Sequence, residues 1–497
     1  MAGSYVCVPF GRQEVVGIVW GEGKQKLSSA QLKPVSRVLE HLPPFADYFL
    51  DYIDWVSRYT LAPKGMVLKM ALPVKEALDK PEPLSGYMWT GKQPAPLTEA
   101  RRKVLDILAD KVPHLTAEIR EKAGASLAVL QGLAAQKVLE PVSLAREAVL
   151  PVPLAPNVPD LSSPQQEAAD TLAGTLGQGF SVTVLDGVTG SGKTEVYFDV
   201  IARTLAASGT AQVLVLLPEI ALSVQWVERC KARFGVEPHI WHSELTPRQR
   251  RKTWREIAQG TARLVVGARS ALFLPYRDLQ LIVVDEEHEQ SYKQEEGVLY
   301  HGRDMAVARA HRQAIPIVLV SATPSLETVW NMQQGRYRQV QLPERHAGAH
   351  LPHVELVDMR QETLESGTWI SPALRTALAD TLANGRQSLL FLNRRGYAPL
   401  LLCRSCGHRF ACTHCSGWMV LHKYSKNLQC HHCGHQAPVP KQCPACQAEE
   451  SLVACGPGVE RITEEVQQIF PQARVAVMTS DTMTSLVMAK DTVTAMT

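Results

Sequence analysis

Long apolar runs are missing from this sequence. No apolar stretch approaches the ~18 residues that a transmembrane helix needs, and the first residues do not resemble a signal peptide. We therefore expect a cytoplasmic location and no membrane partner. Net charge is also small. The formal value of +3 does not by itself indicate a nucleic-acid-binding protein, so any DNA contact must come from local basic groups.

Cysteine is scarce outside one segment. Of the 11 cysteines, only Cys7, Cys230 and Cys455 lie outside residues 403–446, and we expect these three to be buried fillers. The sequence has no internal repeat. Its 45% apolar and 20% charged residues indicate an ordinary globular protein, and its length predicts about three to four domains.

The other cysteines form four Cys-x-x-Cys pairs: Cys403/Cys406, Cys412/Cys415, Cys430/Cys433 and Cys443/Cys446. Two intervening residues let both sulfurs of a tight turn point at one ion, so each pair is half of a tetrahedral zinc site. Four halves predict two zinc ions. A disulfide framework is the alternative, and it needs an oxidising compartment.

The spacing of the cysteine pairs leaves sequential, alternating and nested pairing open. We favour nested pairing, because a hairpin-length segment with strand-like residues 418–421 separates the second and third pairs. Nesting gives one zinc to Cys403, Cys406, Cys443 and Cys446, and the other to Cys412, Cys415, Cys430 and Cys433. Nearby histidines are alternative ligands, but eight thiolates already satisfy two ions.

A glycine-rich loop at residues 187–194 follows an apolar strand-like run and precedes a helical stretch, as a phosphate-binding loop does. We expect its backbone N–H groups to cradle a nucleotide phosphate. Lys193 is expected to neutralise the β- and γ-phosphate oxygens, and Thr194 to bind Mg²⁺. The predicted ATP-contacting residues are Gly187, Val188, Thr189, Gly190, Ser191, Gly192, Lys193 and Thr194.

A second apolar run ends in the acidic sequence DEEH at residues 285–288. Asp285 is expected to hold Mg²⁺, and Glu286 to orient and deprotonate the attacking water. An acidic helix start is the alternative, but it explains Glu287 better than Asp285. The tripeptide at 321–323 is expected to report the state of the γ-phosphate. The predicted catalytic residues are therefore Lys193, Asp285 and Glu286.

Between residues 180 and 340, β-branched runs alternate with helical stretches. The predicted strands are 182–185, 213–217, 264–266, 281–284 and 315–320. Because these runs are apolar throughout, we expect burial on both faces, as in a doubly wound parallel sheet. A second such unit is expected to begin near 389–392 and to resume near residue 451. The fold class is therefore α/β, with RecA-like helicase lobes.

The segments before the phosphate-binding loop predict two smaller domains. Strand-like pieces at 5–9 and 14–20 precede a helical stretch whose aromatic spacing predicts core packing rather than a row for base stacking. Residues 97–142 fit a winged helix, whose second helix enters a DNA groove. A helical hairpin without that role is the alternative. A proline-rich linker at 151–164 follows.

Taken together, these motifs resemble the superfamily 2 DNA helicases that restart replication, the primosomal helicase family. Supporting stretches are GVTGSGKTE at 187–195, PEI at 218–220, GARSALF at 267–273, SYKQEEGVLYHGR at 291–303, SATPSLE at 321–327 and FLNRRGYAP at 391–399. The likeness implies an ATP-dependent 3′–5′ DNA helicase that recognises stalled or collapsed forks and initiates primosome assembly. Implied partners are forked and single-stranded DNA, single-stranded DNA-binding protein and other restart primosome proteins. The implied location is the bacterial cytoplasm, with nucleoid association during restart.

The resemblance also implies a division into domains. They are a partial 3′-end DNA-binding domain at 1–72, a winged-helix domain at 95–145, helicase lobe 1 at 155–342, a partial lobe 2 at 343–402 and 447–482, a two-zinc module at 403–446, and a divergent tail at 483–497.

Residue roles follow from the same resemblance. Gln165 matches the residue that reads adenine. The motifs that contact single-stranded DNA are matched by Pro218, Glu219, Arg269 and Ser270. Residues 291–303 match an aromatic-rich loop that couples DNA binding to ATP hydrolysis, with Tyr292, Lys293, Tyr300 and Arg303 as candidates. Tyr292 is equally a candidate for packing.

The sequence departs from the family pattern in three places. Family chains begin earlier, Val459 stands where threonine is usual, and two late helicase motifs are absent beyond residue 482. We therefore expect a chain truncated at both ends. Because those motifs supply an arginine finger worth ~10³–10⁵ in rate, we expect ATP hydrolysis at least ~10³-fold slower than in a longer relative, and no unwinding. The alternatives are a zinc-containing fork-DNA-binding module without ATP turnover and a zinc-stabilised RNA helicase.

Overall fold

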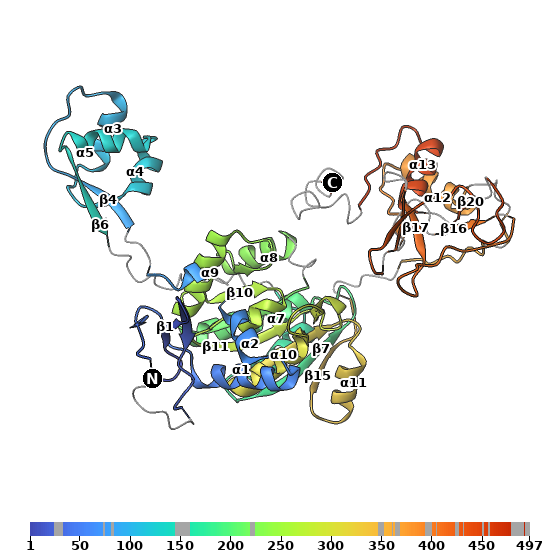
Figure 1. The fold of residues 1–497 in the computed structure, drawn as a ribbon, viewed down its shortest axis with the longest axis horizontal. Coiled ribbons are helices and arrows are strands. Elements are labelled where there is room, and N and C mark those ends of the chain that lie inside the picture. The colour runs from blue at the N-terminus through green and yellow to red at the C-terminus, as the bar shows by residue number, and fades with distance from the viewer. Residues whose placement is uncertain are drawn as a thin grey trace. The chain divides into compact units, whose positions relative to one another are not determined.

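The fold is known from a computed structural model. It describes the chain apart from residues 24–32, 73–74, 81–83, 145–159, 219–223, 346–351, 360, 363–367, 393–399, 404, 423–426, 431, 450–451, 456–457, 479–491 and 493–497. The chain divides into two units, residues 1–350 and 351–497, which are described separately (Figure 1). None of the helices in the described ranges combines the length and apolar composition that crossing a bilayer requires.

A seven-stranded parallel sheet is the centre of the first unit, with the strand order β15-β7-β14-β11-β8-β10-β9. Its strands are β7 Ser181–Gly187, β8 Gln212–Leu216, β9 His239–Trp241, β10 Leu264–Gly267, β11 Leu279–Val284, β14 Pro316–Ser321 and β15 Arg338–Leu342. All five predicted strands are present, which confirms the α/β class. The two edge strands, β9 and β15, were not predicted.

Both faces of this sheet are covered by helices, because successive side chains of a strand point to opposite faces. Val213 and Val215 of β8 pack in one apolar core with the helices α6, α7 and α8, whereas Leu214 and Leu216 pack in another with α9 and α10. The helices are α6 Ser163–Ala173, α7 Lys193–Ala207, α8 Val224–Phe234, α9 Pro247–Gln259 and α10 Gly302–Gln313. We call residues 160–342 lobe 1.

Short elements connect the strands and helices of lobe 1. They are η4 Arg269–Phe273, η5 Gln290–Tyr292, β12 Lys293–Gln294, β13 Tyr300–His301 and α11 Leu326–Gln333. The antiparallel pair of β12 and β13 closes the loop at residues 291–303, so this loop is folded back on lobe 1.

The N-terminal residues form a small antiparallel sheet that packs with lobe 1. The strands of this sheet are β1 Tyr5–Phe10, β2 Gln13–Ile18 and β3 Arg37–Val38. The helices that follow it are α1 Asp47–Thr60, α2 Lys64–Ala71 and η2 Lys75–Ala77. Tyr52 of α1 stacks on Phe273, with ring centroids 5.6 Å apart, and the indole N–H of Trp254 donates to the Ala71 carbonyl at 2.9 Å. Figure 1 shows α1 and α2 beside lobe 1. The prediction of core packing is confirmed for Tyr52, whereas Tyr59 is 59% exposed.

Residues 84–144 form a small body of helices and a three-stranded antiparallel sheet. Its elements are β4 Leu84–Trp89, α3 Glu99–Ile107, β5 His114–Leu115, α4 Thr116–Ala123, α5 Leu127–Ala135 and β6 Leu139–Leu144. It has its own apolar core. The strand β4 lies before the predicted range 95–145 and pairs with β6. Helix α5, the second of the helix pair, has no basic residue and therefore offers no cation to DNA phosphates.

The second unit has only antiparallel strand pairs among its described residues. Its elements are α12 Pro372–Ala383, β16 Leu400–Cys403, β17 Met419–His422, β18 Asn427–Cys430, β19 Gln436–Pro438, β20 Leu452–Cys455 and α13 Val459–Ile469. The prediction of a strand near 389–392 is wrong, because the structure has no strand at these residues. A strand needs a partner for its backbone groups, and no strand in the described part of this unit pairs with this segment. Leu389 and Phe391 are 86% and 85% exposed there.

Candidate functional site

A pocket of about 440 Å³ opens at the carboxyl ends of β7 and β11. Eight predicted site residues line it: Gln165, Thr189, Gly190, Gly192, Lys193, Thr194, Asp285 and Glu286. The pocket also has residues that we did not predict, namely Asp160, Leu161, Glu195 and Arg229. Of these, Glu195 and Arg229 form an ion pair at 2.7 Å. The structure thus brings most of the predicted ATP site together.

The phosphate-binding loop is tight and needs its glycines. Gly190 and Gly192 have φ values of 82° and 84°, which L side chains rarely adopt. A Cβ atom on Gly187 would lie 2.7 Å from the Ser191 hydroxyl, and one on Gly192 would lie 2.2 Å from the Gln165 amide. Helix α7 begins directly after the loop, so its first N–H groups point toward the pocket.

Lys193 folds back over this loop. Its ammonium donates to the carbonyls of Gly187 at 2.7 Å and Val188 at 3.3 Å. Burial lowers the pKa of Lys193, while the carboxylates of Glu286 and Asp285 act in the opposite direction. The acceptors that hold the ammonium at the loop are the two neutral carbonyls. Phosphate oxygens can replace them.

Gln165 is 4% exposed and touches the loop from the other side. Its amide oxygen accepts from the Ser162 N–H at 3.0 Å, and its amide nitrogen donates to the Ser191 carbonyl at 2.9 Å. The side chain therefore links the start of α6 to the phosphate-binding loop.

Asp285 is half-buried at the end of β11. Its carboxylate accepts from the Tyr197 hydroxyl at 2.9 Å and from the Glu286 N–H at 3.0 Å. Burial is the main cause that raises the pKa of Asp285 to about 6, although the Tyr197 hydrogen bond lowers it. A half-buried carboxylate with so few donors fits a cation. Tyr197, which lies one helical turn after Lys193 on α7, was not predicted, although that spacing places it on the same side of the helix.

Glu286 has a strained backbone, with φ at 47°. Its carboxylate lies 3.6 Å from His288 Nδ1, and the same nitrogen lies 2.8 Å from the Ser321 hydroxyl. The Ser321 hydroxyl also accepts from the Thr323 N–H at 3.0 Å. The DEEH segment and the tripeptide at 321–323 are therefore in direct contact.

Glu287 is the most buried acid of this segment, with no exposed surface. One carboxylate oxygen accepts from Arg303, the Ser325 hydroxyl and the Thr328 hydroxyl, each at 3.0 Å. The other oxygen accepts from the Ser325 N–H at 2.7 Å. Arg303, a candidate DNA contact from the sequence, is only 7% exposed, because it neutralises this buried carboxylate.

The aromatic residues of the loop at 291–303 face the protein. Tyr292 is 1% exposed, and its hydroxyl donates to the carbonyls of Leu216 at 3.0 Å and Asp285 at 2.7 Å. Tyr300 is 7% exposed. The structure thus favours the packing role that we considered for Tyr292, since its ring face is not open to a base.

Arg269 holds this loop from the motif GARSALF. Its guanidinium donates to the Gln294 side chain at 2.7 Å and to the Ser291 carbonyl. Among the other candidate DNA contacts, Ser270 and Lys293 are exposed and Pro218 is buried, while Glu219 lies outside the described residues.

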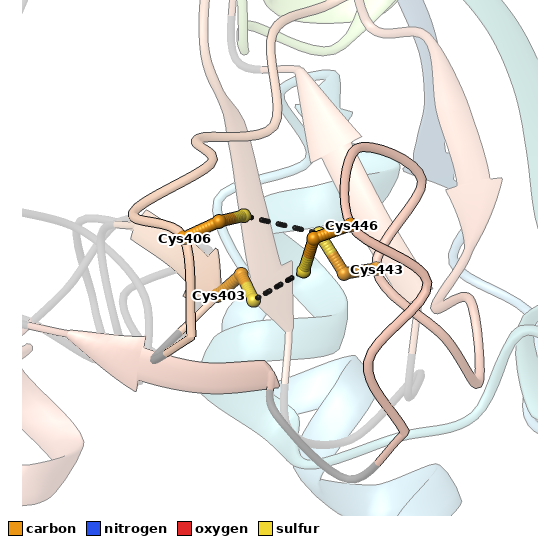
Figure 2. A group of neighbouring side chains, drawn as sticks. All are labelled: Cys403, Cys406, Cys443 and Cys446. Carbon is orange, nitrogen blue, oxygen red and sulfur yellow. Dashed lines mark hydrogen bonds between the residues drawn. The ribbon is translucent and has the colours of Figure 1, made fainter.

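The cysteines of the second unit form two groups of four. Figure 2 shows Cys403, Cys406, Cys443 and Cys446 with their sulfur atoms turned toward one another. The second group is Cys412, Cys415, Cys430 and Cys433, and the sulfurs within each group lie within 4.8 Å of one another. This is the nested arrangement. No third group of possible metal ligands occurs in the described ranges.

The sulfur distances fit zinc and not disulfides. They are 3.6 Å for Cys403–Cys446 and 3.5 Å for Cys412–Cys433, whereas a disulfide bond is ~2.05 Å long. Corners of a tetrahedron with Zn–S bonds of ~2.3 Å lie ~3.8 Å apart. Backbone turns support each group, as in the Gly434 N–H that donates to the Cys430 carbonyl at 2.9 Å. The residues present therefore fit a four-thiolate zinc site in both groups.

Three family models match the chain. A DEAD/DEAH box helicase model covers residues 162–332, a 3′ DNA-binding domain model covers residues 1–73, and a model of the PriA DNA helicase Cys-rich region covers residues 412–438. These ranges contain most of the pocket, the N-terminal sheet and one of the two cysteine groups.

Curated relatives match nearly the whole chain. It is 42% identical to the replication restart protein PriA of Rickettsia felis, over 96% of this chain and 63% of the relative. It is 36% identical to the replication restart protein PriA of Haemophilus influenzae, over 95% of this chain and 66% of the relative. The chain thus spans about two thirds of the length of these relatives. By its domain matches and its relatives, this chain belongs to the PriA family of replication restart proteins.

Proposed function

We propose that this chain acts within an ATP-dependent 3′–5′ DNA helicase that recognises stalled or collapsed replication forks and initiates primosome assembly. The pocket in which Lys193, Asp285 and Glu286 meet is the observation that carries this proposal. The names of the matched relatives add replication restart, and the 3′ DNA-binding match at residues 1–73 adds a strand end as the target.

The proposed cofactor of the pocket is ATP with Mg²⁺. When bound, Mg²⁺ neutralises charge on the phosphates. Asp285 and Thr194 are the residues proposed to hold it. Lys193 exchanges its carbonyl acceptors at the loop for phosphate oxygens. Glu286 is proposed to orient the attacking water and to take its proton.

The proposed metals of the second unit are two zinc ions, one in each cysteine group. Four thiolates complete a tetrahedral shell and leave no open position. Both ions are therefore proposed to be structural, and their task is to hold the turns and short strands of the module.

The proposed DNA contacts in lobe 1 are Arg269, Ser270 and Lys293. Arg269 binds the Ser291 carbonyl, and the next residue, Tyr292, donates to the Asp285 carbonyl at 2.7 Å. A strand that moves Arg269 would therefore act on the Mg²⁺-binding segment through two hydrogen bonds. Fork DNA, single-stranded DNA-binding protein and other restart primosome proteins are the proposed partners.

The pocket is tested by binding of a fluorescent, non-hydrolysable ATP analogue. We expect binding that depends on Mg²⁺, and we expect Lys193→Ala to weaken it at least ~10-fold, since a charge-assisted hydrogen bond to phosphate is lost. Lys231→Ala is the matched control, because Lys231 is an exposed lysine paired with Glu237. Equal affinity of wild type and Lys193→Ala would overturn the assignment.

The catalytic role of Glu286 needs a second measurement. We expect Glu286→Gln to keep the affinity for the ATP analogue and to lose any turnover that fork DNA stimulates in the wild type. If the wild type binds the analogue and fork DNA without hydrolysing ATP, the chain is a binding module instead.

A further inference from the structure

Helix α9 of lobe 1 carries a concentration of positive charge. It has five basic side chains and one carboxylate within Pro247–Gln259, whereas the formal net charge of the whole chain is +3. Arg248, Arg251 and Lys252 lie on one side of the helix, because their spacing is i, i+3 and i+4. The buried residues Trp254 and Ile257 lie on the other side. We call Arg248, Arg251 and Lys252 the basic stripe.

The cations of the basic stripe are not neutralised within lobe 1. In the part of the chain that the structure describes, Arg248 and Arg251 have no hydrogen-bond or ion-pair partner. Lys252 lies 3.8 Å from Glu256, and its side chain is 75% exposed. Such an exposed pair contributes little and exchanges easily. The stripe therefore presents three cations to a ligand, of which Arg248 and Lys252 are exposed and Arg251 is half-buried.

Two further arginines of α9 fix the helix on which the stripe lies. Arg250 donates to the Ser243 carbonyl in the loop after β9. Arg255 donates to the carbonyls of Ala77 at 2.8 Å and Glu76 at 3.0 Å. Both ends of α9 are thus bonded to backbone, so the stripe has a rigid support.

The start of the stripe lies at the edge of the sheet where DNA contacts are proposed. Strands β9 and β10 are parallel, with Trp241 and Gly267 in register at their last residues. The Ala268 N–H donates to the Trp241 carbonyl at 3.0 Å. The two following segments therefore leave the sheet side by side. One leads to Arg248, and the other leads to Arg269.

We propose that the basic stripe binds the phosphate backbone of single-stranded DNA where the strand continues past Arg269 and Ser270 along α9. This inference rests on the proposed function, which places DNA at that edge. Cations on an exposed helix face bind phosphates by neutralisation and release of counterions. The stripe has no aromatic side chain on which a base can stack, so its contribution is independent of sequence.

The test compares two variants of the full chain that lose the same charge. Arg248→Gln/Arg251→Gln removes two cations from the stripe. Arg336→Gln/Arg338→Gln is the control. It removes two exposed arginines at the start of β15, which lies at the opposite edge of the same sheet. Binding of a fluorescent oligothymidylate is measured over a series of salt concentrations.

The expected result is a lower salt dependence for the stripe variant alone. Each phosphate contact to a single strand contributes ~0.7 to the slope of log affinity against log salt, so two lost contacts lower the slope by ~1.4. The affinity falls on the order of tenfold near ~0.2 M salt. The control variant keeps the wild-type slope.

The possible outcomes separate this inference from the proposed function. If the wild type binds and both variants share its slope, the stripe is a solvated face and the inference is overturned. If the wild type does not bind the oligonucleotide, or Arg269→Ala binds as well as the wild type, the proposed DNA contact at this edge fails first. Glutamine is a good helix former, and equal melting temperatures show that the variants are folded. Lys252→Gln provides a second variant, with an expected slope decrease of ~0.7.

Discussion

Lobe 1 and the cysteine-rich module at residues 403–446 hold their structures by different means. In lobe 1, the strands β8 and β10 are buried at every position, and helices cover both faces of the sheet. In the described part of the module, the buried apolar side chains are a small group at Phe410, Met419 and Leu428, which pack with Leu401 and two of the cysteines. A core of this size rarely stabilises a segment of about 45 residues without metals or disulfides.

This difference determines how strongly a single substitution affects the stability of each region. Lobe 1 holds its site residues at helix starts and strand ends on a large apolar core, so a single change weakens one contact. The module has two sets of four thiolates in place of a core, so loss of one ligand removes a principal support. The following predictions test this contrast in order of decreasing effect.

Removal of zinc should unfold the module and leave lobe 1 intact. Structural zinc contributes ~10–16 kcal/mol in small metal-folded peptides, which is more than any other single change predicted for this chain. Hydrogen exchange should show that the amides of β18 lose protection after chelation while those of β8 keep it. Protected β18 amides in zinc-free protein would contradict the contrast.

Single ligand substitutions give a finer version of the same experiment. The wild type should contain about two zinc ions per chain, and Cys430→Ser should contain about one. Cys230→Ser is the control, because Cys230 lies in the apolar core of lobe 1 and should not change the zinc content.

Glu287→Ala should produce the largest loss of stability in lobe 1. The substitution leaves Arg303 buried without its carboxylate, which costs about 3–5 kcal/mol. Chemical denaturation followed by tryptophan fluorescence measures the effect, and the zinc content should stay the same. The double variant Glu287→Ala/Arg303→Ala should recover part of the loss, because no uncompensated charge remains. If the double variant lost more unfolding free energy than the two single variants lose in sum, the ion pair would not be the cause.

Tyr292→Phe should have a smaller effect, about 1 kcal/mol, because the ring stays and only the hydrogen bonds from its hydroxyl are lost. The carbonyl of Asp285 loses a donor, so we expect weaker Mg²⁺-dependent binding of the ATP analogue as well. Tyr276→Phe is a matched control. The buried Tyr276 hydroxyl has no hydrogen-bond partner among the described residues, so its removal should not destabilise lobe 1. Equal effects of the two substitutions would contradict the role of the Tyr292 hydroxyl.

The sequence predicted those parts of the molecule where residue type and spacing determine the local structure. Apolar strands between helices specify the parallel sheet, and the glycines of the loop at 187–194 are needed for its positive φ values. Strand β9 was missed because it has only 3 residues, and β15 was missed because it is largely polar, so the apolar pattern of both is weak. The strand near 389–392 was predicted from the same apolar signal, but the signal does not say whether a partner strand is present.

The direction of a side chain was the main feature that the sequence did not contain. Tyr292 and Arg303 lie in a loop with aromatic and basic residues, a pattern typical of DNA contacts, yet both face inward. Arg303 is buried because Glu287 is buried, and Tyr292 because the Asp285 carbonyl lies within reach of its hydroxyl. Both contacts join segments that are distant in sequence, so only the folded chain reveals them.

Zinc removal should leave the reactivity of the Cys230 thiol in lobe 1 unchanged, while it exposes the cysteines of the module. Burial in the core between α7 and α8 raises the pKa of Cys230 to about 12. At pH 8 the thiolate fraction is therefore on the order of 10⁻⁴, and alkylation should be correspondingly slow. After chelation, iodoacetamide should modify the eight cysteines of the module, while Cys230 should remain unmodified until denaturant unfolds lobe 1. Peptide mapping by mass spectrometry distinguishes the sites. If chelation alone exposed Cys230, the two regions would unfold together, and the independence of lobe 1 from the zinc-supported module would be lost.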